Sequence, residues 1–149
     1  MSLLARHKKP GGFENLVHFL ETTPQEKREK LVAAMAAEDA EFMNRIMRSI
    51  LTFDDLFSIR DEILMEVIFA LGENIRVLAL ALYKIENKTL IEKVKKCLSP
   101  KQMVAYREAE GELDKVTKSQ REGAQLKLVE LTRKVDIERN LKLKPYLLS

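Results

Sequence analysis

The sequence has 149 residues, which is the size of one domain or of two small helical units. Hydrophobic residues make up 46% and charged residues 33% of it, and this mixture with little glycine or proline is typical of amphipathic helices. The formal net charge of +3 argues against a nucleic-acid-binding domain, which normally carries a concentrated basic face. The apolar runs fall short of the ~18 residues that a membrane span needs, so we expect no direct membrane insertion.

The first part of the chain predicts a hinge followed by a helical unit. We expect residues 1–12 to be a flexible segment that ends in a hinge at Gly11 and Gly12, because Pro10-Gly11-Gly12 does not continue a helix easily. Apolar residues at helical spacing then predict a helix over residues 13–20. This helix opens a first compact unit that we place at residues 13–51.

Capping patterns mark the starts of the later helices. Helices are predicted after Thr23, Asp39, Ser58, Asn87, Ser99 and Thr117, a short helical turn after Thr52, and a further helix over residues 74–85. Gly72 is the expected left-handed residue at a helix end. No segment alternates with a period of two, so the fold is predicted to be all-α, with about nine short helices. The second unit is placed at residues 52–139, and a tail over 140–149 is expected to fray.

Side chains that support catalysis are few. His7 and His18 are the two histidines, and His18 lies beside an apolar helical stripe, where a structural or exposed role is favoured. The single cysteine, Cys97, has no histidine near it in the sequence to act as its base, so an inert core residue is favoured, although the neighbouring lysines would lower its pKa. Metal-binding and phosphate-binding motifs are missing, and carboxylates are dispersed. We expect no enzymatic activity, no cofactor and no metal.

The order of charges in the second unit stands out. Residues 84–101 carry six lysines against two glutamates, residues 107–114 carry one arginine against four carboxylates, and residues 115–121 are basic again. Neighbouring blocks of opposite sign form a surface that can dock a complementary partner, and such complementarity sets specificity and association rate more than affinity. An ordinary solvated helical surface is the alternative interpretation.

Short matches in chain order carry a family resemblance. They are Gly11-Gly12-Phe13-Glu14, Asp39-Ala40-Glu41-Phe42, Ile50-Leu51-Thr52-Phe53 with Asp54-Asp55-Leu56, Leu78-Ala79-Leu80-Ala81-Leu82 with Lys84, and Leu98-Ser99-Pro100-Lys101. Through them the chain resembles the C-terminal half of the flagellar motor switch protein FliG. The resemblance implies an armadillo-like helical unit joined by a short hydrophobic linker to a compact helical torque domain.

The resemblance also implies partners and site residues. A hinge that supports docking of the neighbouring switch protein FliM corresponds to Gly11, Gly12, Ile50, Leu51, Thr52 and Phe53. Charges facing the cytoplasmic loop of the stator correspond to Lys84, Lys101 and Glu108, with Arg107 beside them. The resemblance also implies that neighbouring copies of the chain are partners and that nucleic acid is not a partner. The location it implies is the cytoplasmic face of the flagellar basal body.

Two departures from the family pattern keep other interpretations open. Ala109 stands where the family has a second acidic residue, and Thr117 stands where it has an arginine. A divergent helical adaptor with an unrelated partner is one alternative. A FliG-like cytosolic domain of a magnesium transporter is another, with cations expected at Glu108, Glu110 and Glu112. A nucleic-acid binder would instead use the basic patch of Lys93, Lys95 and Lys96.

Overall fold

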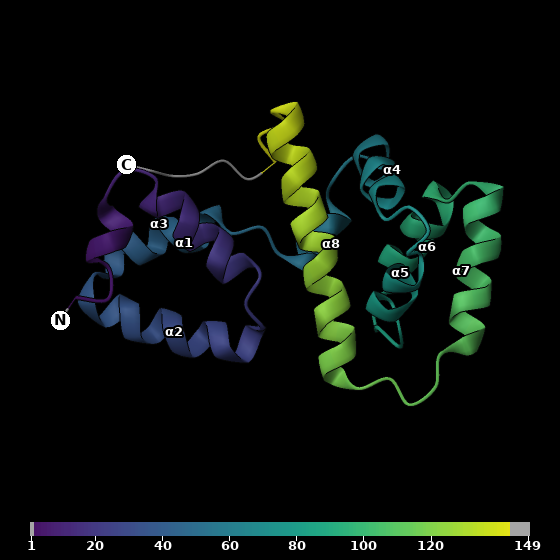
Figure 1. The fold of residues 1–149 in the computed structure, drawn as a ribbon, viewed down its shortest axis with the longest axis horizontal. Coiled ribbons are helices and arrows are strands. Elements are labelled where there is room, and N and C mark those ends of the chain that lie inside the picture. The colour runs from purple at the N-terminus through teal and green to yellow at the C-terminus, as the bar shows by residue number, and fades with distance from the viewer. Residues whose placement is uncertain (1, 144–149) are drawn as a thin grey trace. The chain divides into compact units, whose positions relative to one another are not determined.

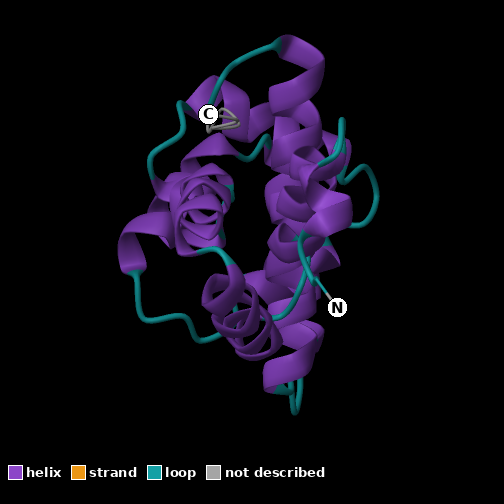
Figure 2. Cartoon of the chain, turned by 90° about the vertical axis from the view of Figure 1, so that its left-hand side faces the viewer, coloured by secondary structure: helices purple, strands orange, loops and turns teal. Residues whose placement is uncertain are grey.

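The computed structural model describes residues 2–143, and helices and loops are the elements that these residues form (Figure 2). The all-α prediction is therefore confirmed. Eight α-helices and two short 3-10 helices occur within the described residues. The described chain divides into two compact units: the first consists of residues 2–51 together with residues 142–143, and the second spans Thr52–Leu141.

The first unit packs three helices and one 3-10 turn around an apolar core. Its elements are η1 (Ala5–Lys8), α1 (Gly12–Glu21), α2 (Gln25–Glu38) and α3 (Ala40–Ser49). Leu4, Phe13, Leu16, Leu20, Phe42 and Ile46 are among the buried residues of the core. Phe13 of α1 meets Phe42 of α3 edge to face, with ring centroids 5.8 Å apart, which is a favoured aromatic geometry.

The helix starts of the first unit follow the predicted caps in one case and not in the other. Asp39 accepts a hydrogen bond from the backbone N–H of Phe42 at 3.0 Å, so its predicted role as the cap of α3 is confirmed. The predicted capping box at Thr23 is wrong. Pro24 occupies the cap position of α2, and the buried Thr23 hydroxyl donates back to the carbonyl of Phe19 in α1. Packing against the preceding helix has turned this side chain away.

The second unit surrounds α5 with longer helices. Its elements are η2 (Phe53–Phe57), α4 (Asp61–Ala70), α5 (Arg76–Ala81), α6 (Lys88–Cys97), α7 (Pro100–Glu112) and α8 (Lys118–Arg139). In Figure 1, α5 lies between α8 and α7, and it packs against both. Helix α4 packs against α8 and α6. This arrangement leaves α7 at one edge of the unit.

Three of the predicted caps of this unit form. The side chains of Asn87, Ser99 and Thr117 each accept a hydrogen bond from a backbone N–H in the first turn of their helix. Ser58, in contrast, does not cap α4, so that prediction is wrong. It ends η2, and Arg60 holds the cap position of α4 without a side-chain bond.

The ends of α4, α5 and α8 show where left-handed residues are needed. Gly72 follows α4 with φ of 59°, as predicted for a helix end. The helix expected over residues 74–85 is shorter: α5 covers Arg76–Ala81, and Lys84 beyond it takes a left-handed conformation. Asn140 ends α8 in the same conformation. Residues 144–149 of the predicted tail lie outside the described residues. Within the described part of the chain, no helix has both the length and the apolar character that crossing a bilayer requires.

Candidate functional site

Helix α7 carries most of the predicted charged residues, and its start is held rigidly. The hydroxyl of Ser99 accepts a hydrogen bond from the N–H of Gln102 at 3.1 Å, and the Gln102 side chain accepts one from the N–H of Ser99 at 2.9 Å. Pro100 occupies the first helical position, where its missing N–H costs nothing. This reciprocal cap fixes the direction in which α7 leaves the preceding loop.

The inward side of α7 is anchored by Tyr106 and Ala109. Both side chains are buried, and Glu110, whose carboxylate acts on the Tyr106 phenol, lies one turn along the helix. Burial, with Glu110 as the second cause, raises the pKa of Tyr106 to about 12. The small Ala109 therefore stands at a packed position, where an acidic side chain would be desolvated.

The outward side of α7 carries three of the four predicted stator-facing charges. Lys101, Arg107 and Glu108 are exposed; their spacing around the helix brings Lys101 and Glu108 to the side opposite Tyr106, with Arg107 at the edge of that side. Val104 lies among them with 59% of its surface exposed. Among the described residues, no ion pair engages any of these three charged side chains. We refer to Lys101, Val104, Arg107 and Glu108 as the charged face of α7.

Lys84, the fourth predicted stator-facing charge, lies apart from the charged face. It follows α5, and its Nζ is 5.3 Å from the ring centroid of the adjacent Tyr83. Together with Tyr106 and Glu110, it lines a hollow of about 530 Å³. Because Tyr106 lies on the inward side of α7 and Lys101 and Glu108 lie opposite it, the structure places Lys84 on a different side of that helix from Lys101 and Glu108.

An apolar groove that the sequence did not reveal runs beside the start of α7. It has a volume of about 1020 Å³, and Met65 and Phe69 of α4, Leu98, Lys101 and Ala105 are among its lining residues. Phe69 is 79% exposed, which is unusual for so large an apolar side chain. The sequence of α4 is apolar on nearly every side, so it predicted burial throughout. Met65 and Phe69 are four residues apart and so share one side of α4. Each follows a buried residue, Leu64 or Ile68, by one position, which places the exposed pair on a different side of the helix from the buried pair.

The predicted linker residues on either side of the Leu51–Thr52 peptide bond are hydrogen-bonded to carboxylates. In the first unit, the N–H of Leu51 donates to a carboxylate oxygen of the buried Glu21 at 2.8 Å. In the second unit, the N–H and hydroxyl of Thr52 donate to the carboxylate of Asp55 at 2.7 and 3.0 Å. Ile50 is buried like Leu51, whereas Phe53 begins η2 and is partly exposed. Hinge motion at Ile50–Phe53 stays a prediction.

The predicted hinge glycines have a packing role at the start of α1. Gly11 precedes α1 with φ of 81°, a conformation that a side chain strains. A Cβ on Gly12 would stand 2.6 Å from the carbonyl oxygen of Arg6 and from backbone atoms of His7, so only glycine fits there against η1. Leu4 is buried in the core of the same unit. Hinge motion at these glycines stays a prediction.

The residues considered for metal binding and for thiol chemistry do not form a site in the described part of the chain. Glu108 lies on the charged face while Glu110 lines the hollow beside Tyr106 and Lys84, and within the described residues no group of three or more His, Cys, Asp or Glu side chains is placed to hold a metal ion. Cys97 is buried, and burial, helped by Asp61, raises the pKa of its thiol despite Lys93 and Lys96. A raised pKa makes a thiol less reactive at neutral pH, as expected for a core residue.

Comparison with known proteins supports one family. The family model of the FliG C-terminal domain matches residues 33–143 of the 149, which covers the end of α2, all of α3 and all of the second unit's helices. No curated protein matches the sequence. The match spans the residues of the linker and of the charged face of α7. The chain therefore belongs to the FliG C-terminal domain family.

Proposed function

We propose that this protein is a non-enzymatic rotor component of the flagellar motor, whose charged face on α7 contacts the cytoplasmic loop of the stator. Membership of the FliG C-terminal domain family supports a flagellar switch or rotor component. The observation that carries the proposal is the set of exposed charges at Lys101, Arg107 and Glu108, which no described side chain neutralises. Charges without internal partners are available to a partner protein.

The charged face has the properties that a repeated, reversible contact needs. Lys101 and Glu108 have opposite charge and lie seven residues apart, which is about 10 Å along a helix. This separation exceeds the Debye length of ~8 Å at physiological ionic strength, so a partner can pair with each charge separately. Exposed ion pairs contribute little to affinity and more to association rate, and such a contact can form and break rapidly.

The linker supports the second part of the proposal, which is docking and switching. We propose that the first unit is armadillo-like and that FliM docks at the linker residues Ile50–Phe53, with neighbouring copies of the chain packed beside it at the cytoplasmic face of the basal body. The bonds of Leu51 to Glu21 and of Thr52 to Asp55 support a hinge there, because they concentrate rotation at one junction. A concentrated pivot lets each unit move as a rigid body.

The experiment measures binding of the immobilised full chain to a stator-loop peptide and to the middle domain of FliM, at low and moderate salt. The test variants are the double reversal Lys101→Glu with Glu108→Lys, and Lys84→Glu alone. Lys27→Glu is the matched control, since Lys27 is an exposed lysine of α2 in the first unit. We expect the double reversal to abolish stator-loop binding and to leave FliM binding intact.

Stability separates a lost contact from a lost fold. Each variant should unfold within about 0.5 kcal/mol of the wild type, because these are surface substitutions. Stator-loop binding that survives the double reversal would contradict the role of the charged face. Loss of binding in Lys84→Glu with no effect of the double reversal would move the contact to the opposite side of α7.

A further inference from the structure

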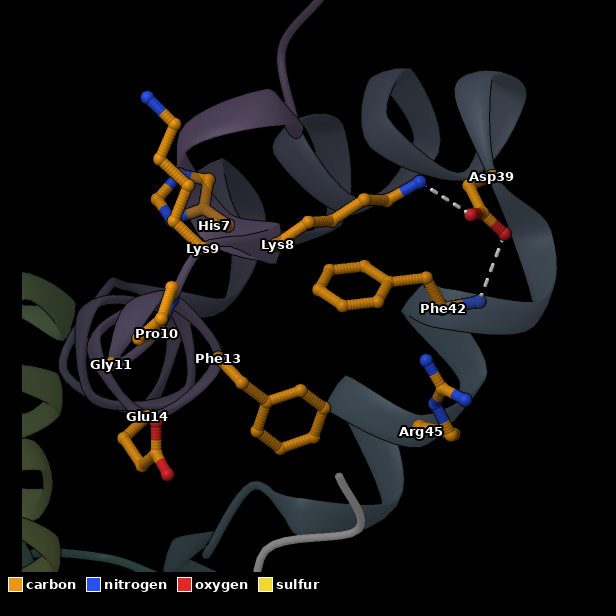
Figure 3. Close-up of a pocket in the computed structure, with 10 residues that line it drawn as sticks. All are labelled: His7, Lys8, Lys9, Pro10, Gly11, Phe13, Glu14, Asp39, Phe42 and Arg45. Carbon is orange, nitrogen blue, oxygen red and sulfur yellow. Dashed lines mark hydrogen bonds and ion pairs between the residues drawn. The ribbon is translucent and has the colours of Figure 1, made fainter. Parts of the chain in front are cut away.

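A pocket in the first unit combines aromatic walls with a concentration of cationic side chains. It lies between η1, the start of α1 and the start of α3, with a volume of about 560 Å³ (Figure 3). Such a volume falls in the range of about 300–1,000 Å³ typical of small-molecule sites. Lys8, Phe13, Asp39, Phe42 and Arg45 are among its lining residues. It is separate from the charged face of α7, which belongs to the second unit.

Two cations flank one aromatic ring in this pocket. The Nζ of Lys8 and the Cζ of Arg45 lie 5.4 and 5.6 Å from the centroid of Phe42, both within cation–π distance. Lys8 also pairs with Asp39, whose Oδ2 is 2.7 Å from its Nζ. The other oxygen of Asp39 accepts from the N–H of Phe42. Hydrogen bonding from Lys8, the main cause, lowers the pKa of Asp39, so Lys8 and Asp39 satisfy each other at neutral pH.

Arg45 has no such partner. Among the described residues no ion pair engages its guanidinium, and its buried Nε has no hydrogen-bond acceptor. A buried donor without an acceptor is destabilising, and more so when the group is charged. The guanidinium is a planar fork that matches a carboxylate through two parallel hydrogen bonds. Figure 3 shows it beside Phe42 at the side of the pocket opposite Glu14.

The other lining residues restrict the ligand. Burial and the neighbouring Arg6 lower the pKa of His7, so the imidazole adds little positive charge near pH 7. Lys9 adds one positive charge on the η1 side, while Glu14 adds a negative one on the α1 side. The surplus of positive charge is therefore small, which favours a singly charged anion over a phosphate. The walls formed by Phe13 and Phe42 favour an apolar group attached to that anion.

We propose that this pocket binds a monocarboxylate carried on an aromatic or aliphatic body, with Arg45 as the group that pairs with the carboxylate. Such a carboxylate is found on free small acids and at the C-terminal end of a peptide with an apolar last residue. Phe13 and Phe42 hold the apolar body, and Lys8 with Asp39 closes one end of the site. The proposal stands independently of the rotor function, because none of these residues lies on α7 or in the linker.

The test is a titration of the isotope-labelled full chain followed through its backbone amide signals. Hydrocinnamate is the free-acid probe, and acetyl-Gly-Gly-Phe with a free carboxylate is the peptide probe. Their neutral amides are the matched controls. We expect saturable shifts at Gly11, Gly12, Phe42 and Arg45 with at least one acid, and binding about tenfold weaker for its amide, because a charge-assisted pair is lost.

Three variants assign the carboxylate to its partner. Arg45→Gln should weaken binding about tenfold, whereas Arg48→Gln, an exposed arginine on the same helix, should leave it unchanged. Glu14→Gln removes a repelling charge without touching the core, so it should strengthen binding even if Arg45→Gln fails to fold. Binding of hydrocinnamate alone identifies a free acid as the ligand, and tighter binding of the peptide identifies a chain end.

The proposal is overturned by any of three results. Acids and amides that bind equally would show that the carboxylate is not recognised. Binding that is unchanged in Arg45→Gln, or not strengthened in Glu14→Gln, would show that the charges of the pocket do not act on the ligand. Shifts that map away from η1, α1 and α3, or no shifts with either acid, would show that the pocket is not a carboxylate site.

Discussion

Glu21 offers the sharpest test of how the first unit holds the linker. Its side chain is 1% exposed, and one of its carboxylate oxygens accepts the N–H of Leu51, a residue buried to the same degree. Glu21→Ala leaves that N–H without its acceptor in a place that water does not reach. Glu21→Gln keeps an acceptor oxygen of the same reach.

The expected loss follows from the burial of the N–H group. A buried donor deprived of its acceptor costs about 1–3 kcal/mol, so we expect Glu21→Ala to lower the free energy of unfolding of the first unit by about 2 kcal/mol. Glu21→Gln should cost less than about 1 kcal/mol. A local loss of about 2 kcal/mol raises the population of opened Leu51 amide about 30-fold.

Native-state hydrogen exchange at the Leu51 amide measures this opening directly, and urea unfolding measures the loss of stability. The amide of Ile46, in the middle of α3, is the internal reference because its helical hydrogen bond does not involve Glu21. We expect faster exchange at Leu51 than at Ile46 in Glu21→Ala. Equal exchange rates at Leu51 in the wild type and in Glu21→Ala would refute the reasoning, since the bond would then contribute nothing to closing the linker.

Two further predictions concern the start of α1 and the inward side of α7. Gly12→Ala places a Cβ 2.6 Å from backbone atoms of η1, so it should displace η1 and lower the melting temperature by several degrees, while Gly11→Ala meets no neighbour and should cost only the ~1 kcal/mol strain of positive φ. Similar melting temperatures for the two variants would contradict a packed η1. Tyr106 has its pKa raised to about 12, above the unfolded value of about 10, so the fold favours the protonated phenol. Its contribution to stability is complete below pH ~10 and is lost as pH rises toward 12. Phenolate absorbance should show a late-titrating tyrosine that Tyr106→Phe removes, and an unchanged titration curve in that variant would argue against the raised pKa.

Most of the helices could be predicted from the sequence because their signals are local. The caps at Asp39, Asn87, Ser99 and Thr117 each join a side chain to a backbone N–H two or three residues away, so no distant residue takes part. Thr23 and Ser58 carry the same kind of signal and failed. The Thr23 hydroxyl found a carbonyl in the preceding helix, and the backbone at Ser58 was already used to end η2. Whether such a side chain caps the next helix therefore depends on a competing acceptor or a neighbouring element.

The sequence by itself determined that this is an all-helical chain and that Lys101 and Glu108 share one side of their helix, because helical periodicity alone sets that side. Only the tertiary structure decided which side of α7 faces outward, since the burial of Tyr106 and Ala109 depends on α5 packing against it. Tertiary packing also separated Lys84 from the charged face and left Phe69 of α4 exposed beside a groove. The pocket around Arg45 likewise depends on η1, α1 and α3 meeting, and contacts between residues this far apart in the chain follow from packing, which no local pattern specifies.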